Sequence, residues 1–461
     1  MLALLSISPI CLRLIRQTIF AMTENKRPDV CMVVHNPLVY DARVLREATS
    51  LARNGLTVVI LSLTPDEYNL PVVEVCRGFT IRRISLPSVY RHLAKSLHKF
   101  LIILQKRGSD SQNSEVSNQT IWSTLKCSIE KLIGKFLSSL YKLLLSDESP
   151  VAMLLVLLRG AYFLRSTNAR VYHAHDFPGL LHVAIAGIWK RPIVYDSHEL
   201  FFDQWHPHEP PKIYRSLRSW EKFLAKRASA ILTVGEMVSD RLAKTLNVKR
   251  PTIIFNAVDL RTLEPSNVIY QTEERRTIVH SGALHYGRHL PELLTSLLYL
   301  PEDIVIVLMG DGLLKGSLQL QAKELGLEDR VIFVLPVLPD SIASTLAQAD
   351  VGAVLITNQS IHYDYSMPNK LFECIAAGLP LIVSHCQEIA DLTQKYDLGV
   401  VCDPTQPKEI AAGILKLLEP SNLLRYKHNV CAARDSFLNW ETEEKKLIGL
   451  YCNLLKENSI K

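Results

Sequence analysis

The sequence of 461 residues lacks several features that would assign it to a specialised class of protein. Its nine cysteines form no CxxC pair and have no regular short spacing, which argues against a disulfide framework or a zinc site and favours buried thiols in a reducing compartment. Aromatic residues make up only 7%, and no nucleic-acid-binding module is recognisable, so nucleic acid is not an expected partner. No apolar run is long enough to span a membrane, because Arg13 and Arg16 interrupt the apolar residues 1–20.

Positive charge is concentrated in one segment. The formal net charge is +6, and 21% of the residues are charged. Between Arg91 and Leu145, nine basic residues are opposed by three acidic ones. Apolar residues recur there at helical spacing on both sides of the polar stretch 109–120. A basic amphipathic helical insert, expected at about 91–165, is typical of contact with an anionic membrane surface. The alternative is that the apolar stripes pack on a sheet and the lysines form a solvated rim.

Apolar runs rich in Val, Ile and Leu alternate with helical patterns along most of the chain. Strands are expected at 29–34, 57–62, 79–84, 170–173, 192–195, 230–234 and 252–255, then at 277–281, 304–309, 331–334, 351–356, 379–383 and 399–402. Continuous apolar strands between helices indicate parallel sheets covered on both faces. The sequence therefore predicts an α/β fold of two Rossmann-like, doubly wound domains, at 22–258 and 259–435, followed by a helical tail at 436–461.

The segment 366–380 carries the most specific pattern in the chain. Pro368 suits the first turn of a helix, where its missing N–H costs nothing, and Gly378 suits the left-handed residue that ends the helix. A strand, a loop and a helix N-terminus in succession present free backbone N–H groups to a phosphate. Lys370 in the first turn opposes the helix dipole, and a bound anion would remove that cost. Glu373 could accept hydrogen bonds from sugar hydroxyls at the edge of the same site.

This segment resembles the donor-site helix of the family 4 (group 1) glycosyltransferases, which transfer sugar from a nucleotide sugar on a GT-B fold. The resemblance implies that Glu373 contacts the ribose and that Pro368 and Asn369 belong to the donor site. A second family glutamate stands eight positions earlier, where this chain has Tyr365. It also implies that the C-terminal helix returns to the first domain, and that the two domains enclose a cleft.

Further donor-side candidates follow strands of the second domain. Gly282 ends the first strand, Gly310 follows the next, and Arg288 precedes an expected helix. Relatives place two basic residues here to neutralise the diphosphate; Arg288 matches the second, and Ala283 occupies the place of the first. Arg288 and Lys370 are therefore the expected catalytic cations, each able to make a charge-assisted contact.

Histidines lie at the end of a strand in the first domain. His173, His175 and Asp176 occupy the edge where open α/β sheets place ligands. Their spacing lacks the i, i+4 geometry of a helical zinc motif and no third ligand is evident, so no metal is expected. The resemblance implies a histidine close to the transferred sugar, and His175 is favoured over His173 for this catalytic place. A buried structural pair is the alternative.

Other acceptor-side candidates come from two neighbouring loops. They are Asn36, Asp41 and Arg43 after the first strand, and His198 and Glu199 after the strand at 192–195. The acids near the second strand could equally serve as helix caps. Because Pro37 stands where relatives have glycine, a diphosphate contact from the first loop is not expected.

The resemblance thus implies a metal-independent glycosyltransferase, and the cysteine usage indicates a cytoplasmic one. The basic insert alone suggests peripheral contact to the inner face of the membrane through residues 91–145, and with it a role in polysaccharide or cell-envelope biosynthesis. The enzyme would need no cofactor: a UDP- or GDP-linked sugar is the donor, and a glycan or lipid-linked acceptor is the partner. Retention of the anomeric configuration is expected. The alternatives are an inverting enzyme similar to the β-mannosyltransferase that acts on chitobiosyl-diphosphodolichol, and a non-catalytic GT-B subunit. Tyr365 and Ala283 favour the latter, whereas Glu373, Arg288 and His175 oppose it.

Overall fold

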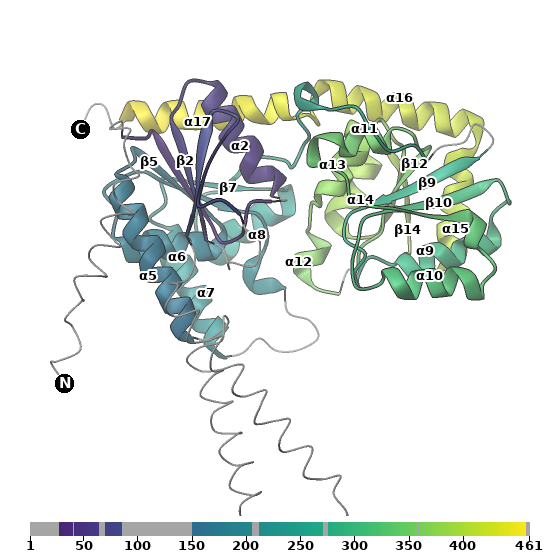
Figure 1. Cartoon of the computed structure of the whole chain (residues 1–461), viewed down its shortest axis with the longest axis horizontal. Helices are drawn as coiled ribbons and strands as arrows, with labels where there is room; N and C mark the ends of the chain where they lie inside the picture. The colour runs from purple at the N-terminus through teal and green to yellow at the C-terminus, as the bar shows by residue number, and fades with distance from the viewer. Residues whose placement is uncertain are drawn as a thin grey trace, which may run out of the picture.

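A computed structural model describes residues 27–39, 41–63, 70–84, 150–204, 212–270, 275–357 and 359–457. Two α/β units lie side by side, each with a sheet between layers of helices (Figure 1). The predicted fold class is confirmed. The basic segment 91–145, on which membrane contact is predicted, lies outside the described residues. Within the described part of the chain, none of the helices combines the length and apolarity needed to cross a bilayer.

The N-terminal sheet is parallel except at one edge. Its strands run in the spatial order β3 (Val73–Cys76), β4 (Phe79–Ile84), β2 (Val58–Leu63), β1 (Val30–Val34), β5 (Val171–His175), β6 (Ile193–Ser197), β7 (Ala230–Thr233) and β8 (Thr252–Ile253). Strand β1 is buried along its whole length, as expected for a central strand covered on both faces. The antiparallel edge strand β3 is not among the predicted strands, because its burial alternates and its apolar side chains are largely exposed.

Helices cover both faces of this sheet. They are α2 (Ala42–Arg53), α5 (Pro150–Thr167), α6 (Asp176–Ala186), α7 (Lys212–Ala225) and α8 (Glu236–Leu246), with the 3-10 turn η2 (Phe201–Asp203). Helix α2 lies on one face, whereas α5, α6 and α7 pack in sequence along the other (Figure 1).

The C-terminal sheet is wholly parallel. Its order is β11 (Val331–Val334), β10 (Ile304–Met309), β9 (Arg276–Ser281), β12 (Val351–Val354), β13 (Leu381–Ser384) and β14 (Gly399–Cys402). The helices are α9 (Leu290–Ser296), α10 (Lys315–Glu324), α11 (Ile342–Leu346), α12 (Ile361–Asp364), α13 (Asn369–Ala376), α14 (Gln387–Lys395) and α15 (Pro407–Leu418). The strand order reverses between β9 and β12, and ligands bind beyond the carboxyl ends of strands at such a point.

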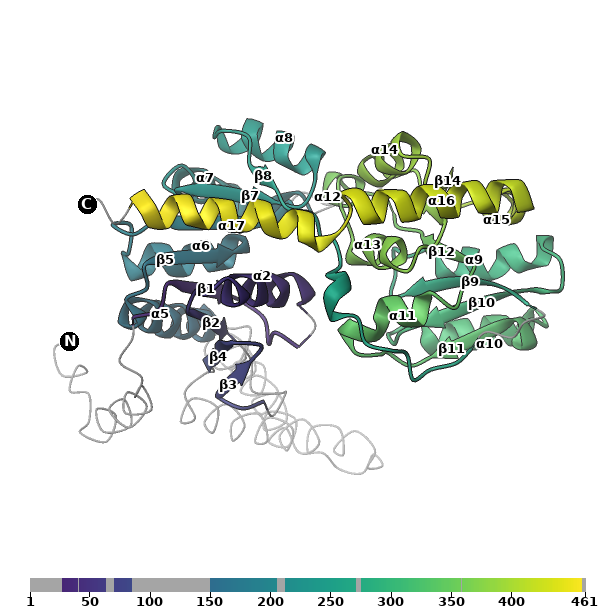
Figure 2. The ribbon, with the colours of Figure 1, turned by 90° about the horizontal axis from the view of Figure 1, so that it is seen from above.

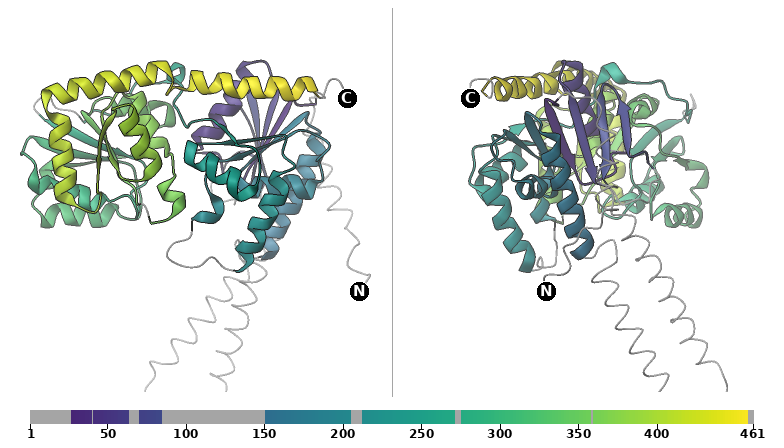
Figure 3. Two further views of the ribbon diagram at one scale, coloured as in Figure 1. Left: turned by 180° about the vertical axis from the view of Figure 1, so that it is seen from behind. Right: turned by 60° about the vertical axis from the view of Figure 1, so that its left-hand side comes forward.

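Two helices join the units. Helix α16 (Pro420–Ser436) lies on the C-terminal unit, and α17 (Trp440–Glu457) continues it along the N-terminal sheet (Figures 2 and 3). The Trp440 Nε1 donates to Ser50 Oγ on α2 at 2.7 Å. Tyr451 Oη lies 2.7 Å from His173 Nδ1 on β5. The end of the chain is thereby part of the N-terminal core.

A second junction crosses between the units beside the cleft. The carboxylate of Glu388, on α14, accepts hydrogen bonds from the backbone N–H groups of Glu236 (2.8 Å) and Met237 (2.6 Å), on α8. Glu388 therefore caps the N-terminus of a helix that belongs to the other unit. A Cβ at Gly235 would lie 3.0 Å from this carboxylate, so glycine allows the close approach.

Candidate active site

Two cavities adjoin between the carboxyl ends of the two sheets. The first has a volume of ≈ 540 Å³, and the second ≈ 500 Å³. Asn369, the first residue of α13, lines both of them. Each cavity is walled by residues of both units, so a ligand here would contact both.

The first cavity joins an apolar wall to a single buried acid of α13. The wall includes Met309, Pro336, Val337, Pro339 and Ile342. On the other side, Ser281 Oγ donates to Glu373 Oε2 at 3.0 Å. Burial raises the pKa of Glu373, against the opposing effects of the Ser281 hydrogen bond and Arg46. Asp259, Asp311 and Asp340 also line this cavity, and an apolar slot with carboxylate acceptors at its edges suits a flat base attached to a hydroxylated ring.

Glycines allow the two strand ends to approach closely at this cavity. Gly310 has φ +154°, and a Cβ there would lie 1.9 Å from the carbonyl oxygen of Gly282. Any side chain at Gly310 would collide with backbone, so this floor requires glycine. Both predicted donor-side glycines line the first cavity.

Three basic side chains gather at the N-terminus of α13. Lys370 is 7% exposed, and its Nζ has no hydrogen-bond partner among the described residues. Burial, together with Arg288, lowers its pKa well below the usual value. His280, on β9, is fully buried; burial, Lys370 and Arg288 lower its pKa, and a hydrogen bond with the Ala353 backbone opposes them. Unpartnered donors beside free helix N–H groups suit an anion.

Arg288 and the start of α13 face the second cavity. Arg288, Pro368 and Asn369 line it. The backbone of Pro368 is extended (φ −70°, ψ 144°), so the helix begins at Asn369 and Pro368 is its N-cap. Burial lowers the pKa of Arg288. The structure thus brings Arg288 close to Lys370, which is distant from it in the sequence, and Glu373 lies one turn further along α13.

The residue in place of the family's first glutamate does not supply an acid to this cavity. Tyr365 ends α12 and packs against the hydrophobic core. The neighbouring carboxylate of Asp364 accepts from the backbone N–H of Gln387 at 2.9 Å and so caps α14. Among the described residues that line the second cavity, Glu199 is the one acid, and it comes from the N-terminal unit.

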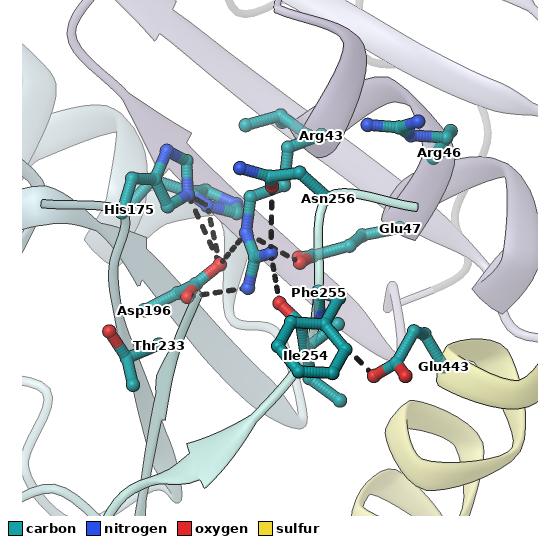
Figure 4. A network of polar contacts seen from close by, with 12 residues as sticks. Arg43, Arg46, Glu47, His175, Asp196, Thr233, Ile254, Phe255, Asn256 and Glu443 are labelled. Atoms are coloured by element: carbon teal, nitrogen blue, oxygen red, sulfur yellow. Dashed lines mark hydrogen bonds and ion pairs between the residues drawn. The ribbon is translucent and has the colours of Figure 1, made fainter. Parts of the chain in front are cut away.

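A buried ion-pair network lies beneath the N-terminal wall (Figure 4). Arg43 donates to both carboxylate oxygens of Asp196, at 2.8 and 2.9 Å, and to the Ile254 carbonyl at 2.7 Å. Its Nε also lies 3.2 Å from Glu47 Oε1. Although burial opposes it, Arg43 holds the pKa of Asp196 well below its usual range. Burial and Asp196 raise the pKa of Glu47 to about 8. This arrangement makes Arg43 a structural cation that cannot reach a ligand.

The predicted histidines occupy different depths in this network. His173 and His175 are 0% and 1% exposed, their ring centres lie 4.1 Å apart in a stacked arrangement, and neither lines either of the two cavities. His198, in contrast, lines the second cavity, with its Nε2 3.1 Å from both His175 Nδ1 and Asp196 Oδ2. Burial lowers the pKa of His198, but Asp176 and Asp196 outweigh it and raise that pKa to about 10. His198, which lines the second cavity, is thus a cation at neutral pH, and the more deeply buried His175 contacts its ring.

The donor atoms of Glu47, His173, His175 and Asp196 lie within 4.8 Å of one another, which is close enough for a metal ion. The guanidinium of Arg43 is already bonded to both carboxylates of this group. A metal ion would have to displace or repel that cation. The donor set therefore does not suit a metal.

The other predicted acceptor-side residues divide between the cavity and the scaffold. Glu199 lines the second cavity, and burial and Asp176 raise its pKa to about 7. Asn36 Nδ2 donates to Asp41 Oδ2 at 2.7 Å, and Asp41 Oδ1 accepts from Val44 N as the cap of α2. Neither Asn36 nor Asp41 lines either of the two cavities described above. Asp176 accepts from the backbone N–H of His198 at 2.9 Å and positions that loop.

Sequence reasoning missed Arg46, one turn along α2 from Arg43. It lines the first cavity and lies close enough to Glu373 for the carboxylate to raise its pKa, although burial dominates and lowers that pKa to about 10. Its Nη1 donates to the Ala257 carbonyl at 2.6 Å, whereas Nε and Nη2 are buried with no partner in the described chain. The i, i+3 spacing of two arginines on one helix was the available signal.

Comparison with known proteins places this site in a class. Two α/β units with a cleft between their sheets define a GT-B fold. The chain aligns over 94% of its length with all of the sucrose-phosphate synthase structure from Thermosynechococcus elongatus (TM-score 0.62, 13% identity). It also aligns over 92% with all of Anabaena HepE in complex with UDP (TM-score 0.61, 14% identity).

Sequence models identify the family. Residues 88–262 match the model "Glycosyltransferase Family 4", and residues 266–429 match "Glycosyl transferases group 1". The chain belongs to this family of glycosyltransferases, as the resemblance predicted.

Curated relatives are distant. An uncharacterized glycosyltransferase of Methanocaldococcus jannaschii is 19% identical over 253 residues (51% of this chain and 63% of the relative). A Campylobacter jejuni enzyme, named N-acetylgalactosamine-N,N'-diacetylbacillosaminyl-diphospho-undecaprenol 4-alpha-N-acetylgalactosaminyltransferase, is 22% identical over 191 residues (41% and 50%). The chain spans 30% to 63% of the length of the curated relatives that it matches.

Proposed function

We propose that this protein transfers a sugar from a nucleoside diphosphate sugar to a glycan or lipid-linked acceptor. The nucleoside would occupy the first cavity, and the sugar and acceptor the second. The observation that carries the proposal is the Lys370 ammonium, which is buried close to Arg288 with no hydrogen-bond partner in the described chain and directly follows Asn369, the residue that lines both cavities. A diphosphate there would bind this cation and the N–H groups of α13. The UDP held by HepE supports a uridine donor.

Catalysis would depend on positioning the substrates and on stabilising the negative charge of the leaving phosphate. When the bond between sugar and diphosphate breaks, negative charge grows on the leaving phosphate, and Lys370, Arg288 and the helix terminus stabilise it. Glu373 would hold the ribose hydroxyls. The donor set beneath the cleft does not suit a metal, which supports activity without one.

The acceptor would enter beside His198 and Glu199. We place His198, rather than the deeper His175, next to the sugar, because His198 lines the second cavity and carries positive charge at neutral pH. The lipid-linked acceptor named for the C. jejuni relative supports an acceptor of that class.

Retention of anomeric configuration follows the family resemblance, but one observation favours inversion. Glu199 lines the second cavity with a pKa near 7, as a general base for the acceptor hydroxyl requires. The anomeric proton coupling of the product, measured by NMR, separates the two courses.

Thermal stability against UDP, GDP, ADP and CMP tests the donor site. One nucleotide should stabilise the wild type by roughly 2.7 kcal/mol at a hundredfold excess over Kd. The shift should vanish in Glu373→Ala, persist in the control Glu324→Ala on the exposed surface of α10, and survive EDTA. If no nucleotide shifts the wild type, the non-catalytic GT-B subunit becomes the better explanation.

A further inference from the structure

Helices α5, α6 and α7 form one layer that faces away from α17 and from the second unit (Figures 1 and 3). Six large apolar side chains on this layer are about half exposed. They are Leu154 (53%), Leu158 (50%) and Tyr162 (49%) on α5, Ile185 (45%) on α6, and Trp220 (55%) and Phe223 (48%) on α7. We name these six residues the α5–α7 surface. Single exposed apolar residues are ordinary, but a group on three adjacent helices indicates a binding surface.

The exposed apolar residues are evenly spaced along α5 and in contact with each other on α7. Leu154, Leu158 and Tyr162 follow one another at four-residue intervals, so they form a single stripe along α5. On α7, the rings of Trp220 and Phe223 meet edge to face with centroids 5.8 Å apart. The guanidinium of Arg227 lies 3.6 Å from the Phe223 ring centre. Apolar residues, an indole and a cation thus occupy one exposed face.

Charge on this layer is predominantly positive, although Arg218 on α7 is paired with Asp203 of η2. Helix α5 contains two arginines and no acid, and α7 contains four basic residues and is followed directly by Lys226 and Arg227. The one acid of α7, Glu221, is 5% exposed and accepts a hydrogen bond from Tyr195. Lys190 and Arg191 add two cations between α6 and β6. The one acid of α6, Asp176, lies at the cleft end, where it holds His198.

The sequence continues this positive charge towards the N-terminus. The segment 91–145, which carries nine basic and three acidic residues, lies shortly before α5, with Asp147 and Glu148 between the two. A surface that joins apolar side chains, tryptophan, tyrosine and an excess of cations matches the boundary of a bilayer that contains anionic lipid. A protein partner would have to present an acidic surface to complement these cations, whereas anionic lipid supplies the negative charge together with an apolar layer.

We propose that the α5–α7 surface binds a membrane containing anionic phospholipid. The apolar side chains enter the boundary between headgroups and acyl chains, and the flanking cations contact lipid phosphates. This interaction is independent of sugar transfer, and it extends the predicted membrane contact from the insert to a defined face of the folded domain.

Sedimentation of the full chain with vesicles tests the proposal. Wild type should bind phosphatidylcholine vesicles that contain 30% phosphatidylglycerol (a chosen composition) far better than phosphatidylcholine alone, and less well at high salt. Trp220→Ser/Phe223→Ser should weaken binding by roughly tenfold or more, because two half-exposed aromatic side chains are lost. The matched control is Leu313→Ser/Leu320→Ser, which removes two apolar residues exposed by 77% and 56% on the other unit and should change nothing.

The other possible results distinguish membrane binding by this surface from binding by the insert alone and from contact with a second copy of the chain. Equal vesicle binding by wild type and Trp220→Ser/Phe223→Ser, or no binding by wild type, overturns the proposal. If Lys131→Glu/Lys135→Glu/Lys142→Glu releases the protein while the α7 variant stays bound, the insert alone is responsible and the proposal is again overturned. A concentration-dependent dimer that Trp220→Ser/Phe223→Ser abolishes would instead assign this face to a second copy of the chain. An unchanged nucleotide shift in every variant shows that the fold and the donor site are intact.

Discussion

Replacing Lys370 with methionine tests the proposed phosphate site through two effects of opposite sign. In the unliganded protein the ammonium is 7% exposed and has no hydrogen-bond partner in the described chain. A buried donor without a partner costs about 1–3 kcal/mol, and a charged one costs more. Methionine fills similar space without that cost. Lys370→Met should therefore stabilise the free protein by about 1–3 kcal/mol, which raises Tm by about 2–4 °C per kcal/mol for a domain of this size.

The same substitution should weaken nucleotide binding. A charge-assisted hydrogen bond to phosphate contributes about 1.5–3 kcal/mol, so UDP affinity should fall by roughly tenfold or more. Differential scanning fluorimetry with and without UDP measures both effects on one sample. Lys416→Met, on the exposed surface of α15, is the control and should leave both values within about 0.5 kcal/mol of wild type. A free variant less stable than wild type, with its UDP shift retained, would refute the reasoning.

Two further predictions concern Glu199 and Glu388. Burial and Asp176 raise the pKa of Glu199 from 4.5 to about 7, so its contribution to stability is full below about pH 4.5 and is lost as the pH rises through 7. Between pH 5 and 8, the free energy of unfolding measured in urea should fall by ~1 kcal/mol less in Glu199→Gln than in the wild type. The same pH dependence in both proteins would contradict this prediction. Glu388→Ala removes the acceptor for two N–H groups of α8, which should cost ~1–2 kcal/mol and speed hydrogen exchange at Glu236 and Met237. Unchanged exchange would show that the cap does not hold the two units together.

Local signals predicted helix α13 well. A proline before the helix and a glycine after it delimit α13, and Gly378 has φ +74° as a left-handed residue should. Most expected strands agree with the observed ones within two residues, because a central parallel strand is apolar along its whole length. Lys370 could be singled out because its charge conflicts with the helix dipole, which is a purely local observation.

How deeply the histidines at the strand ends are buried could not be predicted from the sequence. The strand-end position of His175 indicates the correct edge of the sheet, but its burial depends on His198 and on the ion pair between Arg43 and Asp196, which are 153 positions apart. The partner of His173 is Tyr451, 278 positions away on α17. Pairings over such distances arise from topology, which the composition of a strand end does not encode.

The distribution of unpartnered cations explains why the two units must meet for the site to be complete. The C-terminal unit lacks a basic residue at Ala283, and Lys370 and Arg288 are the cations that it places at the N-terminus of α13 among the described residues. The N-terminal unit contributes Arg46, which reaches the first cavity and the neighbourhood of Glu373 from α2. Its two unpartnered nitrogens are buried there at a desolvation cost that an anionic ligand would offset. A ligand that contacts Arg46 only when the two units lie together binds that arrangement more tightly than the separated one. The ligand therefore stabilises it by the difference between the two binding free energies. Donor binding and closure of the cleft are therefore expected to strengthen each other, with Arg46 as the link between them.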